Sequence, residues 1–170
     1  MDNNGSPKLV IEEAFLRAYD DFSDAIFRHC YFRVYDRERA KDLTQEVFTR
    51  VWEYIARGSE IRNMRPFLYR VANNLIIDES RKKKEISLDM LHEKGFEPSI
   101  EETGKIQRNL DAKSALSFVH KLEDIYREIM VMKFIDDLSL KEIAGILGLS
   151  ENVVSVRIHR GTKRLMEIIQ

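Results

Sequence analysis

Apolar residues recur at helical spacing over most of this chain. Between residues 43 and 55 they fall at intervals of four and three, which places them on one face of a helix. Asp36 is placed to cap the start of that helix, and Gly58-Ser59 is placed to end it. No segment shows the alternation of a half-buried strand. The pattern therefore predicts an all-α protein.

Residues 8–84 are predicted to form an N-terminal domain, a bundle of about four helices. The first helical pattern starts at Lys8, and we expect it to break at the paired acids Asp20-Asp21. The last helix of the bundle carries Pro66 in its first turn, where proline is tolerated, and ends in a basic run at residues 81–84.

Periodicity is lost over residues 85–110, which are acidic and rich in turn-forming residues. We expect a flexible linker there, and its length favours two small domains over one. Helical spacing returns in residues 111–170, the predicted C-terminal domain. Its candidate helices are 111–122, 124–135, 139–147 and 151–169.

The sharpest local signal lies in residues 138–160. Ser139 and Glu142 have the spacing of a capping box, and Gly148 lies where the turn between two helices needs left-handed backbone. Ser150 is placed to cap the helix that follows. These features occur in the order and spacing of a helix-turn-helix, which binds duplex DNA.

The last helix is expected to have one buried face and one that is available to DNA. The buried stripe is Val154, Ile158, Gly161 and Leu165. The opposite side combines small groups suited to base edges with cations suited to phosphates, namely Asn152, Ser155, Val156, Arg157, His159 and Arg160. The alternative is a pair of packed helices with a solvated basic face.

Total charge does not point to nucleic acid, because the 170 residues carry a net charge of -1. The distribution is more informative. Residues 62–84 hold seven basic and two acidic residues, and residues 157–164 hold four basic residues and no acidic one. The segment between these two basic regions is acidic, so both predicted domains carry a local positive charge.

The residues give no case for an enzyme or a cofactor. No nucleophile–base pair or phosphate-binding glycine loop is present, and the four histidines lack the spacing of metal ligands. The single cysteine, Cys30, excludes an internal disulfide and is expected in the core. Without a signal peptide or an apolar stretch of about 20 residues, a cytoplasmic protein with no membrane insertion is expected.

Residues 67–78 combine aromatic, amide and cationic side chains on one helix. This mixture suits unstacked bases, because aromatic rings stack on them, amides hydrogen-bond their edges and cations hold the backbone. A solvated polar face would show the same composition. From these residues alone, both interpretations stay open.

The segment Asp42–Trp52, with Pro66–Asp78 and the basic run after it, resembles the second domain of extracytoplasmic-function (ECF) sigma factors of bacterial RNA polymerase. Residues 139–165 resemble their fourth domain, and the two motifs occur in the same order as in the family. The resemblance implies a subunit that binds core RNA polymerase and directs promoter-specific initiation. It would recognise the −10 and −35 elements and assist promoter melting.

The resemblance also implies roles for single residues. Those that would dock on the clamp coiled coil of the polymerase are Asp42, Gln45, Glu46 and Phe48. Those that would bind the −10 element are Asn74 and Asp78 at the bases, and Arg70, Arg81 and Lys82 near the backbone. Those that would face the −35 element are Asn152, Ser155, Val156, Arg157, His159 and Arg160.

Further partners follow from the same resemblance. The loop of residues 57–63 would capture a flipped base of the −10 element, and the acidic linker would thread toward the polymerase active site. The implied partners are core RNA polymerase (its clamp coiled coil and flap), promoter DNA and an anti-sigma factor.

Two features depart from the family pattern. Many members carry a cation at the position of Ser155 and a polar residue at that of Val156, so we expect different base readout, with Val156 against a thymine methyl. Residues 121–124 lack the proline common there, and we expect Asp124 to cap the next helix.

Two other functional classes remain open at the level of sequence. One is a self-sufficient helix-turn-helix regulator whose N-terminal bundle serves dimerisation or sensing. The other is a helical bundle that binds only proteins. If the protein is a sigma factor rather than a self-sufficient regulator, substitution of Asp42 or Gln45 should abolish transcription yet spare isolated DNA binding. If it binds only proteins, substitution of Arg157 and Arg160 should cause no loss of function.

Overall fold

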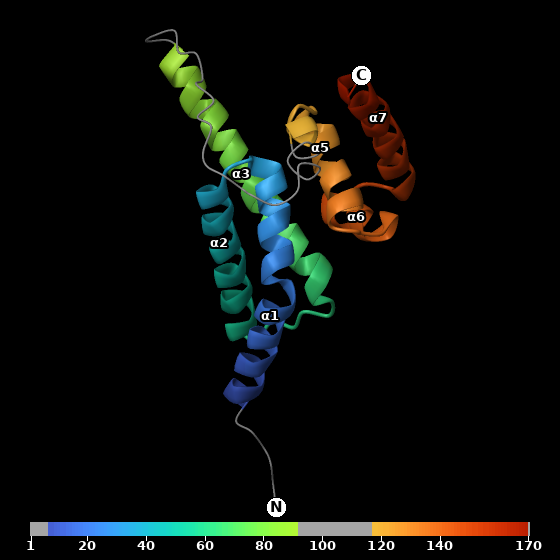
Figure 1. Ribbon diagram of the computed structural model, residues 1–170. Coiled ribbons are helices and arrows are strands. Elements are labelled where there is room, and N and C mark those ends of the chain that lie inside the picture. Colours follow the sequence, from blue (N-terminus) through green and yellow to red (C-terminus); the bar gives the residue numbers. More distant parts are fainter. Residues whose placement is uncertain (1–6, 92–116, 170) are drawn as a thin grey trace, which may run out of the picture.

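A computed structural model describes residues 7–91 and 117–169, and every regular element in these ranges is a helix (Figure 1). The predicted all-α fold is confirmed. The N-terminal part contains α1 (Pro7–Val34), α2 (Arg37–Ala56) and α3 (Met64–Leu91).

The ends of α2 follow the local signals in the sequence. The Asp36 carboxylate accepts a hydrogen bond from the backbone N–H of Arg39 at 2.9 Å, as expected of an N-cap. Gly58 follows the helix with a φ of 83°, a left-handed conformation that glycine adopts without steric cost. Both predictions are confirmed.

Two helices run further than the sequence pattern predicts. α1 is continuous through Asp20-Asp21, because both side chains are exposed and solvated while the apolar face continues beneath them. Three helices rather than about four therefore fill this part. α3 continues through residues 85–91, the start of the expected linker, which are rich in good helix formers. Residues 92–110 and the start of the next expected helix, 111–116, lie outside the described residues.

The three N-terminal helices bury a common apolar core. Its buried members include Ile26 and Cys30 from α1, Leu43, Val47 and Val51 from α2, and Leu68, Tyr69 and Ala72 from α3. Cys30 is fully buried, as expected, and this burial raises the pKa of its thiol to about 12.

The C-terminal part is built from shorter helices. Residues 117–120 are helical, and α5 (Asp124–Met130) runs directly into a π-helical turn, η1 (Val131–Ile135). Then come α6 (Leu140–Leu147) and α7 (Glu151–Ile169). The expectation that Asp124 caps α5 is wrong, since Glu123 is the N-cap, without a side-chain hydrogen bond. Asp124 is the first helical residue, where its charge still favours the helix N-terminus.

The two parts pack against each other. α6 lies against α3, and η1 lies against α1. In Figure 1, α7 lies on the side of the C-terminal part that faces away from α1 and α2. One continuous set of buried apolar residues runs through both parts, from Ile26 to Val154.

Candidate nucleic-acid and protein interfaces

The geometry of residues 139–153 is that of the predicted helix-turn-helix. Ser139 Oγ accepts from the backbone N–H of Glu142 at 3.2 Å, and the Glu142 carboxylate accepts from the backbone N–H of Ser139 at 2.8 Å. Gly148 ends α6 in the left-handed region with a φ of 66°. Ser150 Oγ accepts from the backbone N–H of Val153 at 3.3 Å. The capping box, the turn glycine and the second cap are all confirmed.

These contacts also shift the pKa of the capping residue, Glu142. Partial burial by itself would raise the pKa of Glu142. The hydrogen bonds from Ser139 and the Arg65 guanidinium outweigh this and hold the pKa below its usual value. The carboxylate is therefore ionised in its role as a hydrogen-bond acceptor.

α7 buries one stripe against α5. Val154 is fully buried, Gly161 is buried, and Ile158 and Leu165 are half-buried. A Cβ on Gly161 would lie 3.0 Å from Cγ of Met130, so the glycine allows the two helices to approach closely. This packing fixes which side of α7 faces outward.

The outward side of α7 carries the residues expected to face the −35 element. Arg157 is half-buried, and the others are exposed: Asn152, Ser155, Val156, His159 and Arg160. Arg157, Arg160 and Lys163 form no ion pair with any residue in the described part of the chain. Their charges are therefore available to an anionic partner.

The expected −10 residues lie on α3 at intervals of three and four positions, which places Arg70, Asn74, Asp78 and Arg81 on one face. Asn74 and Lys82 are exposed, and Asp78 is half-buried with Arg81 at 3.5 Å. Arg70 is exposed, but its guanidinium donates to the backbone carbonyl of Gly145 in α6 at 3.0 Å. The structure thus brings this set together and places one member against the C-terminal part.

The four residues expected to dock on polymerase have two kinds of environment. Asp42, Gln45 and Glu46 are exposed on α2, whereas Phe48 is only 3% exposed. Its ring packs edge-on against Tyr19 and Phe15 of α1, with centroids at 4.8 and 6.3 Å. Phe48 therefore supports this surface from beneath.

A groove of about 610 Å³ adjoins these residues, and α1 supplies half of its lining. The lining residues are Glu12, Phe15, Leu16, Tyr19, Gln45, Phe48, Thr49 and Trp52. The sequence interpretation missed the α1 side of this groove. Leu16 is 59% exposed and Tyr19 is 46% exposed, and together they give the groove an apolar wall. The spacing of residues in the sequence does not reveal that this face of α1 is exposed.

The sequence interpretation also missed the polar contacts between the two parts. His29 Nδ1 lies 2.6 Å from a carboxylate oxygen of Asp136, and both side chains are fully buried. Arg33 is buried, pairs with Glu128 at 3.5 Å and donates to Asn73 at 2.7 Å. Burial lowers the pKa of Arg33, and the charge of Glu128 opposes that shift. His29 and Asp136 are 107 positions apart, so no spacing rule connects them.

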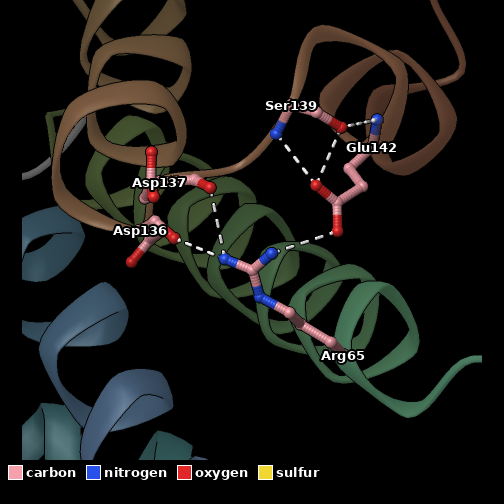
Figure 2. A network of polar contacts seen from close by, with 5 residues as sticks. All are labelled: Arg65, Asp136, Asp137, Ser139 and Glu142. Carbon is pink, nitrogen blue, oxygen red and sulfur yellow. Dashed lines mark hydrogen bonds and ion pairs between the residues drawn. The ribbon is translucent and has the colours of Figure 1, made fainter.

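Figure 2 shows a second group of contacts centred on Arg65 of α3. Its guanidinium donates to the backbone carbonyls of Asp136 and Asp137 at 2.8 and 3.3 Å. It also lies 3.2 Å from the Glu142 carboxylate at the start of α6. One side chain of the N-terminal part thus binds both the end of η1 and the capping box of α6.

Within the described ranges, no cluster of three or more His, Cys, Asp or Glu residues is placed to hold a metal ion. Of the helices described, none combines the length and the apolar character needed to cross a membrane.

Comparisons with known proteins identify both parts of the chain. Residues 18–86 match the family "Sigma-70 region 2", and residues 113–165 match "Sigma-70, region 4". The ECF RNA polymerase sigma factor SigW of Bacillus subtilis is 33% identical over 91% of this chain and 88% of its own length. BldN of Streptomyces coelicolor, also an ECF sigma factor, is 29% identical over 92% of this chain and 61% of its own length.

Solved structures agree on the fold. The sigma factor RpoE, in complex with the anti-sigma factor NepR from Bartonella quintana, matches with a TM-score of 0.78 at 18% identity, over 92% of this chain and 97% of that one. CnrH, in complex with the cytosolic domain of CnrY, matches with a TM-score of 0.66 at 23% identity, over 93% and 88% of the two chains.

The two sigma-70 regions occur in order along the chain. The first includes the exposed polar faces of α2 and α3, and the second includes that of α7. The similarity to SigW extends over nearly the whole chain. This protein belongs to the extracytoplasmic-function family of RNA polymerase sigma factors, the subunits that direct transcription initiation.

Proposed function

We propose that this sigma factor uses three separate helical faces, on α2 for core RNA polymerase, on α3 for the −10 element and on α7 for the −35 element. The observation that carries the proposal is the uncovered basic face of α7. It lies within the region 4 match, and its cations Arg157, Arg160 and Lys163 have no partner among the described residues. Unpaired cations beside short polar groups are what a recognition helix requires.

At the −35 element, the N-terminal turns of α7 enter the major groove. Asn152 and Ser155 hydrogen-bond base edges, and Val156, which is 42% exposed, contacts a thymine methyl group. His159 and Arg160 lie one turn further along, where Arg160, with Arg157, holds phosphates. In this arrangement the uncharged side chains select the base sequence, and the cations supply most of the affinity for DNA.

At the −10 element, α3 acts on bases that have left the helical stack. Asn74 and Asp78 bind base edges, and Arg70, Arg81 and Lys82 hold the backbone of the separated strand. The loop of residues 57–63 lies directly before α3 and receives a flipped base. Binding of unstacked bases favours the open strands, which assists promoter melting.

On core polymerase, Asp42, Gln45 and Glu46 of α2 dock on the clamp coiled coil, with Phe48 fixing the helix beneath them. The C-terminal part contacts the flap. We also propose an anti-sigma partner, because the similar sigma factor RpoE was solved with an anti-sigma factor. We propose a cytoplasmic location, because the bacterial core polymerase and the promoter DNA that it would bind are found there.

A run-off transcription assay with core polymerase and a promoter library tests this proposal. The wild-type chain should yield promoter-specific transcripts, and the double substitution Asp42→Ala/Gln45→Ala should abolish them while leaving −35 duplex binding unchanged. Glu38→Ala is the matched control, since this acid on α2 is also exposed and its ion pair among the described residues is with Lys41. If wild-type protein directs no initiation, the sigma proposal fails. Tight, specific binding of DNA without polymerase would favour a self-sufficient regulator.

A further inference from the structure

An exposed isoleucine lies on α3, the helix that we assign to the −10 element. Ile77 is 46% exposed, and over residues 64–83, where the side chains of α3 are described, it is the only large apolar residue exposed to this degree. The other large apolar residues of this stretch are buried or half-buried in the core. A single exposed isoleucine is common on protein surfaces, so its position has to carry any assignment.

The helical register places Ile77 within the proposed −10 face. It follows Arg70 by seven positions and Asn74 by three, and it precedes Arg81 by four, which are the spacings of one side of a helix. Arg70, Asn74 and Arg81 are exposed and polar, and they suit base edges and phosphates. Ile77 instead offers an apolar surface, which suits the flat face of a base.

Opening of a duplex exposes such a flat face. Where the two strands separate, the last intact base pair loses the stacking contact of its neighbour. Proteins that unstack DNA commonly fill this gap with an apolar side chain, isoleucine among them. Isoleucine is also stiff in a helix, because its β-branch leaves one preferred rotamer, and so it loses little entropy when it inserts. Ile77 therefore has the chemistry that the end of an opened duplex requires.

The neighbours of Ile77 along α3 suit the two sides of such a junction. Asn74, one turn earlier, would bind an unstacked base, and the loop of residues 57–63 before α3 would receive a flipped base. Arg81, one turn later, would hold the backbone. We propose that Ile77 is a wedge residue, whose side chain stacks on the last intact base pair at the edge of the melted −10 element and keeps the strands apart. The inference rests on the proposed function.

Packing between the two parts of the molecule is the other role that this position allows. Ile77 lines a cleft of about 620 Å³ between α1, α3 and α5. Ile125 of α5, which is 42% exposed, lines the same cleft. If Ile77 served only to pack there, removal of either isoleucine would have the same effect. Ile125 therefore provides a matched control of the same residue type and similar exposure, outside the proposed DNA-binding faces.

The test is run-off transcription with core polymerase on two templates. One is the fully paired promoter that gives the strongest signal with the wild-type protein. The other has the same non-template strand, with the template strand changed across the −10 element so that this region is already open. The variants are Ile77→Ala, which removes the wedge, Ile77→Val, which keeps a β-branched group, and the control Ile125→Ala. Chemical denaturation checks that each variant is folded.

We expect Ile77→Ala to initiate about tenfold more slowly than the wild-type protein on the paired promoter, because the unstacked base pair is no longer covered. On the open template its rate should equal that of the wild-type protein. Ile77→Val should retain most of the activity, and Ile125→Ala should match the wild type on both templates. A fluorescent adenine analogue in the −10 element brightens when it unstacks, and this signal should fall for Ile77→Ala on the paired promoter.

The inference is overturned if Ile77→Ala and the wild-type protein have equal rates on the paired promoter. A loss of the same size on both templates also contradicts it, since a residue that only contacts bases or supports the fold acts equally after opening. An equal loss in Ile125→Ala would show that packing in the cleft is responsible. Failure of the proposed function gives a different result, because the wild-type protein then yields no transcript from either template.

Discussion

Arg70 shows how much a single side chain depends on its surroundings. Its position on the exposed face of α3 suits contact with a DNA backbone, yet its guanidinium lies on the Gly145 carbonyl. Phe48 is a second case, since its ring lies beneath the expected polymerase surface. A substitution of Phe48 would therefore act through packing as well as through binding.

The cations of α7 allow a prediction for one residue. Arg160→Ala should weaken −35 duplex binding to a similar extent for every sequence and lower the slope of log K against log salt by about 1, because one phosphate contact is lost. Binding is measured by fluorescence anisotropy in a salt titration. Arg164→Ala is the matched control, since Arg164 pairs with Glu167 at 3.1 Å. Equal losses in the two variants would contradict the proposed role of Arg160.

At the scale of elements, the helix-turn-helix depends on its caps. α6 has only eight residues, so its own backbone bonds contribute little and its capping box counts for more. Glu142 joins this box to Arg65 of α3, which links the stability of the element to the packing of the two parts (Figure 2).

Removal of the cap gives a prediction for this element. Ser139→Ala loses the hydrogen bonds of Ser139 Oγ with Glu142, at 3.2 and 2.8 Å, and should lower the free energy of unfolding by about 1 kcal/mol. Chemical denaturation followed by circular dichroism measures the change. Ser139→Thr keeps a hydroxyl at the cap and should retain most of the stability. A loss in the threonine variant as large as that in the alanine variant would show that the hydroxyl is not what stabilises α6.

At the scale of the whole molecule, charge is balanced overall and segregated locally. The net charge of -1 gives the free chain little general attraction to DNA, while net positive charge is concentrated on α3 and α7. Polymerase would hold both DNA-binding faces near the promoter and so raise their effective concentration.

This balance predicts weak binding by the free protein. A salt titration of the free chain with duplex DNA of unrelated sequence should give only weak, strongly salt-dependent binding, whereas the complex with core polymerase should select promoter DNA. Tight binding by the free chain would show that recognition does not need polymerase. The same titration on Asp137→Asn, which removes one exposed negative charge, measures how much a single surface charge alters nonspecific DNA binding.

The sequence by itself determined the helices, most of their caps and the polar faces that they expose, but not the N-cap of α5. Asp36, Ser139 and Gly148 act on neighbours within a few positions, and a buried stripe repeats every three or four residues, so both signals can be read locally. The family followed from two such local motifs in order. The sequence pattern underestimated the lengths of α1 and α3. Paired acids do not end α1, because their side chains lie on its solvated face, and α3 continues past the point at which apolar spacing is lost.

Only the tertiary structure decided which of these faces are covered. The burial of Phe48, the α1 side of the groove and the polar contacts between the two parts all depend on residues that are far apart in sequence. His29 and Asp136, separated by 107 positions, meet because α1 packs against η1. Spacing along the chain encodes which side of a helix is apolar, but the partner of that side is selected by the packing of the whole molecule.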